Sequence, residues 1–169
     1  YGLKLDEENL GKEYTVSAWV KPDGTLAENQ NVLFLGYHNP EKWLAVSGKK
    51  TGTNTCKIWE NGNGYKWSTF WSPEIDTEGW HNITLSGKSG QVTAYVDGIK
   101  LGTHDSNDPL DGENQGIYLG VTNWDAEFEG LVDEVNVYDI ALTEKEVQEQ
   151  NKADYTRTAS YTHLTLRTK

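Results

Sequence analysis

Three acidic residues alternate with uncharged ones in the segment Glu74-Ile75-Asp76-Thr77-Glu78. If this segment were a strand, the alternation would place the three carboxyl groups on one face of a sheet. Glu74 could then act as the nucleophile and Glu78 as the acid of a retaining glycoside hydrolase, whose two carboxyl groups must lie about 5 Å apart. The pattern therefore raises the hypothesis of glycosidic bond hydrolysis.

The neighbouring residues favour a turn at this place. The acidic segment follows Ser72-Pro73 and leads directly into Gly79-Trp80, and Asp, Ser, Pro and Gly are typical turn residues. The four histidines lack the spacing of a zinc site. No glycine-rich phosphate loop follows a predicted strand, and the sequence contains no nucleophile elbow. We therefore predict that the protein is not an enzyme.

Aromatic residues suggest a different chemistry, which is the binding of sugar. The chain has seven Trp and nine Tyr and no Met, and such a set is too large to fit one core. In the predicted hairpin of residues 57–71, alternation places Tyr65, Trp67 and Trp71 on one face, with Trp59 able to face them from the other strand. Exposed rings of this kind can stack on the apolar faces of sugars. The alternative is that these rings belong to the core, because Trp is highly buried on average.

Other polar and aromatic residues could form the rim of such a site. Trp124 follows Asn123 in a predicted loop, and His38 follows Tyr37 in another. Asn, Asp, Gln and His side chains can satisfy the hydroxyl groups of a sugar. The further candidates for carbohydrate contact are Asn61, in the turn of the aromatic hairpin, and Trp43, at the start of a predicted strand.

Composition limits the class of partner. A chain of 169 residues is long enough for one domain with a single core. The net charge of −11 argues against nucleic acid, whose binding needs clustered Lys and Arg. No stretch approaches the apolar length of a membrane span, so we expect no membrane insertion. The single Cys56 rules out a disulfide within the chain.

Short alternating runs, each closed by Gly, Asn, Asp or Pro, predict an all-β protein with antiparallel sheets packed face to face. In residues 14–20, Val16, Ala18 and Val20 share one face. Asp97-Gly98 predicts a two-residue hairpin turn, and Thr143 with Glu146 predicts the capping box of one short helix. The other strands are predicted at residues 31–37, 43–47, 56–60, 65–71, 80–86, 91–96 and 131–138.

The end of the chain differs in composition from the rest. From residue 153 onward it is rich in Thr and carries more basic than acidic side chains. We therefore predict one domain over residues 1–152. Residues 153–169 form a tail, which is either added sequence foreign to the domain or an edge strand.

Three stretches of the sequence resemble a known family. Residues 14–22, residues 80–98 and residues 128–143 resemble the opening strand, the central hairpin, and the closing strand with helix cap of laminin-G-like domains. These belong to the concanavalin A-like lectin and glucanase superfamily. The resemblance implies a two-sheet antiparallel jelly-roll β-sandwich with one short C-terminal helix. In the non-catalytic relatives a turn lies at the position of Glu74 and Glu78.

The resemblance also implies a function. The expected protein is a non-catalytic carbohydrate-binding module of a secreted, extracellular enzyme that degrades plant or microbial polysaccharide, tethered to the catalytic domain of that enzyme. Two alternatives stay open: an adhesion or protein-interaction domain of a cell-surface protein, and a retaining β-glucanase that uses Glu74 and Glu78. The relatives hold a structural calcium ion with an Asp of the closing strand, which Asp133 matches, and hard oxygen ligands suit Ca²⁺. An exposed Asp at the start of a strand is the alternative interpretation.

Overall fold

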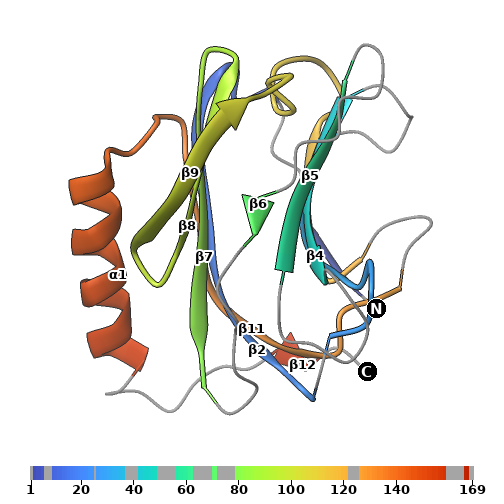
Figure 1. The fold of residues 1–169 in the computed structure, drawn as a ribbon, viewed down its shortest axis with the longest axis vertical. Helices are drawn as coiled ribbons and strands as arrows, with labels where there is room; N and C mark the ends of the chain where they lie inside the picture. Colours follow the sequence, from blue (N-terminus) through green and yellow to red (C-terminus); the bar gives the residue numbers. More distant parts are fainter. Residues whose placement is uncertain are drawn as a thin grey trace.

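The chain folds as an all-β sandwich, as predicted, in a computed structural model (Figure 1). Two antiparallel sheets of six strands each pack face to face. Sheet A has the strand order β1-β10-β3-β4-β5-β6, and sheet B has the order β12-β11-β2-β7-β8-β9. The structure describes residues 2–5, 9–24, 26–36, 42–48, 56–62, 70–71, 79–121, 126–158 and 166–167.

The strands of sheet A are β1 (Leu3–Leu5), β10 (Gly116–Leu119), β3 (Asn31–Gly36), β4 (Lys42–Gly48), β5 (Cys56–Gly62) and β6 (Phe70–Trp71). Those of sheet B are β12 (Leu166–Arg167), β11 (Gly130–Tyr138), β2 (Glu13–Pro22), β7 (His81–Lys88), β8 (Gln91–Val96) and β9 (Ile99–Asp105). The strand β10 was not predicted from the sequence. Of the strand predicted at residues 65–71, the structure describes only β6.

The core lies between the two sheets. Val16, Ala18 and Val20 of β2 are buried there, as their alternation predicted. From sheet A, alternate residues of each strand meet them, including Leu33 and Leu35 of β3. Successive side chains of a strand point to opposite faces, so the residues between these leucines belong to the face of sheet A that is turned away from sheet B. We call this the outer face of sheet A.

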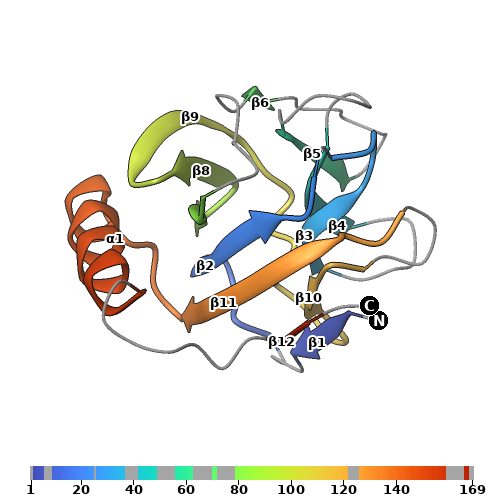
Figure 2. The same ribbon diagram turned by 90° about the horizontal axis from the view of Figure 1, so that it is seen from below.

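The outer face of sheet B carries the helix α1 (Glu144–Thr158) (Figures 1 and 2). Buried polar side chains of this face form hydrogen bonds with α1 and with the residues that lead into it. Thr15 Oγ1 donates to the carbonyl oxygen of Ile140 at 2.8 Å and accepts from the backbone N–H of Leu142 at 2.9 Å. Gln150 Nε2 on α1 donates to Ser17 Oγ at 3.0 Å. Hydrogen bonds therefore fix the helix on this sheet.

Two local predictions from the sequence are confirmed. Asp97 and Gly98 have φ values of 52° and 75°, as a type I′ hairpin turn requires. Thr143 and Glu146 form the predicted capping box, in which the Thr143 N–H donates to Glu146 Oε2 at 2.7 Å. The helix runs on to Thr158, so the domain boundary predicted after residue 152 falls inside α1. Beyond it, β12 pairs with β11 at the edge of sheet B.

Candidate functional site

A single row of paired residues crosses five strands on the outer face of sheet A. Lys4 of β1 pairs with Tyr118 of β10, Tyr118 with Phe34 of β3, and Phe34 with Ala45 of β4. Ala45 in turn pairs with Trp59 of β5. We call these five residues the aromatic row. Because residues directly opposite in a sheet have Cβ atoms about 5 Å apart, the row is continuous across the face.

Two rings of this row, Phe34 and Tyr118, pack together, and Trp43 of the neighbouring row packs on Phe34. Phe34 and Trp43 are stacked with centroids 5.7 Å apart, and Tyr118 meets Phe34 edge-on at 5.7 Å. Phe34 and Trp43 are buried, whereas Tyr118 is half-buried. Such aromatic pairs contribute about 0.5–1.5 kcal/mol each beyond the area that they bury. The ring of Tyr118 therefore has a fixed place on the face and still offers surface to a ligand.

The neighbouring row contains two paired glycines. There Gly116 pairs with Gly36, and Gly36 with Trp43, which pairs with Asn61. A Cβ atom at Gly116 would lie only 2.9 Å from Cε2 of Tyr118, so the glycine allows the Tyr118 ring to lie over it. At Gly36, φ is 114° and a Cβ atom would lie 2.4 Å from the carbonyl oxygen of Lys42. Both glycines are buried, and they allow neighbouring groups to approach the sheet backbone closely beside the aromatic row.

A third row lies on the other side of the aromatic row. Ser47 of β4 pairs with Lys57 of β5, and Lys57 with Trp71 of β6. Lys57 and Trp59 are two residues apart on one strand and therefore belong to the same face. Because Trp71 pairs with Lys57, the register assigns Trp71 to the same face as Trp59. The Lys57 ammonium donates a hydrogen bond to the side-chain oxygen of Asn29. The register thus aligns two of the predicted tryptophan positions on one face of sheet A.

The predicted carbohydrate-binding residues are described to different degrees. Trp43 lies on the outer face and is buried, with 4% of its surface exposed. For Trp59, Asn61 and Trp71 the structure describes the backbone position, as given above, and not the side chain. The remaining candidates lie outside the described residues: Tyr37, His38, Tyr65, Trp67, Asn123 and Trp124. Glu74 and Glu78, the residues of the hydrolase alternative, also lie outside them.

Sequence reasoning missed Lys4, Phe34 and Tyr118. The two aromatic residues both stand between aliphatic residues. Phe34 lies between Leu33 and Leu35 in β3, and Tyr118 lies between two aliphatic residues of β10. Such runs are typical of strands that are buried on both faces, so they gave no indication of a binding face. In both strands an aromatic residue alternates with aliphatic ones, and this alternation indicates that the ring lies on the face opposite to the aliphatic side chains. Their pairing, however, depends on long-range topology.

Asp133, the predicted calcium ligand, lies on the outer face of sheet B, opposite Trp19. Its Oδ1 accepts the backbone N–H of Glu134 at 2.8 Å, and Glu134 has a φ of 44° at an irregularity between Asp133 and Asn136. Among the described residues, no group of three His, Cys, Asp or Glu side chains is arranged to hold a metal ion. Backbone carbonyl oxygens are a further kind of ligand that Ca²⁺ accepts.

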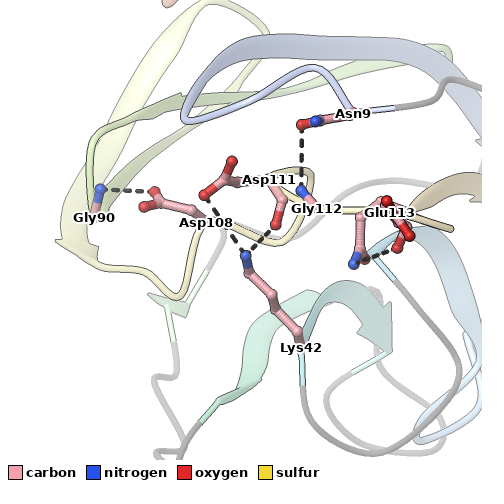
Figure 3. Close-up of polar contacts among 8 residues, drawn as sticks. Asn9, Lys42, Gly90, Asp108, Asp111, Gly112 and Glu113 are labelled. Carbon is pink, nitrogen blue, oxygen red and sulfur yellow. Dashed lines mark hydrogen bonds and ion pairs between the residues drawn. The ribbon is translucent and has the colours of Figure 1, made fainter.

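Acidic residues of the connection between β9 and β10 have a structural role (Figure 3). Asp108 Oδ1 accepts the backbone N–H of Gly90 at 2.7 Å. Lys42 donates a hydrogen bond to the carbonyl oxygen of Asp111, and its Nζ lies 4.0 Å from Oδ2 of the same residue. Asn9 Oδ1 accepts the N–H of Gly112 at 3.2 Å. These contacts tie the connection to both sheets at the end of the sandwich.

Within the residues that the structure describes, no helix is both long and apolar enough to cross a bilayer. The helix α1 has 15 residues, and two acidic side chains lie in its first turn.

Solved structures resemble this fold closely. Domain 4 of AbnA, an extracellular arabinanase from Geobacillus stearothermophilus in complex with arabinotriose, has a TM-score of 0.69 and 28% sequence identity, over 88% of this chain and 71% of that chain. The carbohydrate-binding domain CBM40 of a Ruminococcus gnavus sialidase, bound to sialyllactose, has a TM-score of 0.66 and 16% identity, over 89% and 96%.

A SAP-like pentraxin from Limulus polyphemus has a TM-score of 0.65 and 16% identity, over 87% of this chain and 73% of that chain. At 16% identity, the pentraxin and the sialidase domain show only that the fold is shared. A comparison with curated proteins found no match. A family model, Laminin_G_3, matches residues 2–148, which confirms the resemblance found in the sequence. The chain therefore belongs to the Laminin_G_3 family of the concanavalin A-like lectin/glucanases superfamily.

Proposed function

We propose that this chain is a non-catalytic module that binds polysaccharide on the outer face of sheet A. The observation that carries the proposal is the aromatic row, in which Phe34 and Tyr118 pack together on a face turned away from the core. Sugar rings present apolar C–H faces that can stack on the exposed part of the Tyr118 ring, which packs against the buried Phe34. The Tyr118 ring lies over Gly116, and its half-buried surface is the part of the row that a sugar could contact.

The comparison with the arabinanase domain supports carbohydrate as the class of ligand. That domain was solved in complex with arabinotriose and is 28% identical to this chain. The sialidase domain, at 16% identity, supports only the fold. A plant or microbial polysaccharide is therefore the ligand that we propose, and arabinan is the first polymer to test.

Hydrolysis would need acidic side chains beside the sugar-binding face, and Glu74 and Glu78 lie outside the described residues. In the strands of sheet A that the structure describes, the register places no Asp or Glu on the outer face. A retaining hydrolase needs two carboxyl groups about 5 Å apart beside the sugar. The role of a module without them would be to hold a tethered catalytic domain, in a secreted enzyme, at its substrate. Tethering raises the local concentration of substrate without any new catalytic contact.

Affinity gel electrophoresis tests the proposal directly. The protein is run through gels that contain arabinan, a β-glucan, a xylan or a galactan, with a gel lacking polysaccharide as reference. We expect retardation by at least one polymer, and less retardation of Tyr118→Ala. Ile99→Ala is the matched control, because Ile99 is an exposed side chain of sheet B, with 65% of its surface accessible.

A negative result would favour another function. If no polymer retards the protein and a glycan array also shows no binding, the carbohydrate proposal is wrong. An adhesion or protein-interaction domain, the second class that the sequence left open, would then be the better hypothesis.

We also propose a structural calcium ion at Asp133. The proposal is supported by the position of this carboxylate on the closing strand and by the local irregularity that follows it in β11. Backbone carbonyl oxygens near Asp133 would complete the ligand set. Since this residue lies on sheet B and the aromatic row lies on sheet A, the ion would stabilise the fold without touching the sugar.

A further inference from the structure

The outer face of sheet A differs in charge from the rest of the protein. The whole chain has 26 acidic and 15 basic residues, with a net charge of −11. On this face, the register of the described strands places two lysines, Lys4 and Lys57, and no acidic residue. The described strands of sheet A therefore carry only basic charge on this face, in a protein that is acidic as a whole.

Lys4 lies beside the packed rings. Its side chain is exposed, and its Nζ lies 5.8 Å from the centroid of the Tyr118 ring. A cation at this distance from an aromatic ring is attracted to the ring face, which keeps the ammonium group beside Tyr118. A sugar stacked on Tyr118 would therefore carry its substituents within reach of this ammonium group.

Lys57 lies at a distance from Lys4. Four strand intervals separate β1 from β5 in sheet A, which corresponds to about 19 Å at the usual spacing of strands. Screening in physiological salt acts over about 8 Å, so the two ammonium groups act independently. The charge beside Tyr118 is thus provided by Lys4.

We propose that this face selects polysaccharides that carry an anionic group, a carboxylate or a sulfate, on the sugar that stacks on Tyr118. Lys4 is the residue that determines this specificity. The proposal rests on the proposed carbohydrate-binding function and names the class of sugar. The net charge of −11 opposes binding of a polyanion at long range, but salt screens distant charges more than the close contact at Lys4.

Matched pairs of polymers test the proposal. Polygalacturonate is compared with its methyl ester, and dextran sulfate with dextran, because each pair differs chiefly in charge. Binding is measured by affinity electrophoresis at low and high NaCl. We expect tighter binding of the charged member of at least one pair, with the preference weakened by salt. The pair that shows the preference identifies the anionic group as carboxylate or sulfate.

Variants of Lys4 separate its role from general electrostatics. Lys4→Gln should weaken binding of the charged polymer about fivefold, the upper range for one exposed ion pair. It should weaken binding of the neutral partner less than binding of the charged polymer, and it should lower the melting temperature only slightly, since Lys4 is exposed. Lys4→Arg should retain the preference. Lys100→Gln is the matched control, because Lys100 is an exposed lysine of β9 in sheet B.

The outcomes distinguish this inference from the function on which it rests. If the protein binds neutral polysaccharide and shows no preference for either charged polymer, the selectivity proposal is wrong and the binding function stands. The same conclusion follows if Lys4→Gln retains the full preference. If no polymer binds, neutral or charged, both proposals fail.

Discussion

Replacement of Tyr118 by alanine tests whether the aromatic row binds sugar or serves only the fold. Tyr118 is half-buried, and its ring meets Phe34 edge-on at 5.7 Å. Phe34, its neighbour in the row, is buried, with 1% of its surface exposed. The two rings therefore differ in what their removal should cost, although they are paired in the same row.

For Tyr118→Ala we expect a large loss of affinity and a small loss of stability. Removal of an aromatic anchor from a binding interface typically costs about 2 kcal/mol, which corresponds to roughly a 30-fold weaker dissociation constant. The folded state loses one aromatic pair and part of one buried ring, about 1–2 kcal/mol. For a chain of this length, that lowers the melting temperature by about 2–8 °C.

For Phe34→Ala we expect the opposite balance. Truncation of a buried Phe costs about 3–5 kcal/mol of folding stability, or about 6–20 °C in melting temperature. Tyr118→Phe is the conservative control, because it retains the ring and should retain most of the affinity.

Affinity electrophoresis with the best polysaccharide gives the binding constants, and thermal unfolding followed by circular dichroism gives the melting temperatures. Both measurements are made on the wild-type protein and on all three variants. The reasoning is refuted if Tyr118→Ala binds as tightly as the wild type. The sugar-binding surface would then lie elsewhere, and the aromatic row would be a packing feature of sheet A.

Three further predictions concern other parts of the chain. Chelation by EDTA should lower the melting temperature without abolishing sugar binding, because an ion at Asp133 stabilises only the folded state; an unchanged melting curve would show that no such ion is bound. Hydrogen bonds from Thr143 lower the pKa of Glu146, so this carboxylate stabilises the fold above its unfolded pKa, and the contribution is lost as the pH falls through the folded pKa. Acid titration of the melting temperature should show this loss in the wild type and less of it in Glu146→Gln. Finally, Glu74→Gln and Glu78→Gln should leave glycan affinity nearly unchanged, and a reducing-sugar assay of the wild type on β-glucan should detect no product; hydrolysis that both variants lose would contradict a non-catalytic role.

Local sequence patterns determined the elements of this protein. The alternation of Val16, Ala18 and Val20 predicted which face of β2 is buried, because a strand turns successive side chains to opposite sides. Asp97-Gly98 predicted its hairpin, since the turn needs two residues with positive φ. The capping box of Thr143 and Glu146 predicted the start of α1. Each of these features depends on residues that are close in the sequence.

The candidate site was only partly accessible to such reasoning. The sequence singled out Trp59 and Trp71, because they stand in one aromatic hairpin. It also singled out Trp43, but it did not predict that the Trp43 ring packs on Phe34. The alternation that separates Phe34 and Tyr118 from the core was visible in principle. Their role was not, because an aromatic ring in an aliphatic strand is as well suited to a core as to a binding face.

Tertiary structure alone decided that Lys4, Tyr118 and Phe34 lie side by side. These residues belong to β1, β10 and β3, which are adjacent in sheet A but far apart in the sequence. Hydrophobic burial makes each strand turn its aliphatic side to the core, and this requirement does not specify which strand becomes its neighbour. The pairing follows from the topology of the whole sandwich. For this reason the sequence determined which residues could form a binding face, and the fold determined which of them are neighbours.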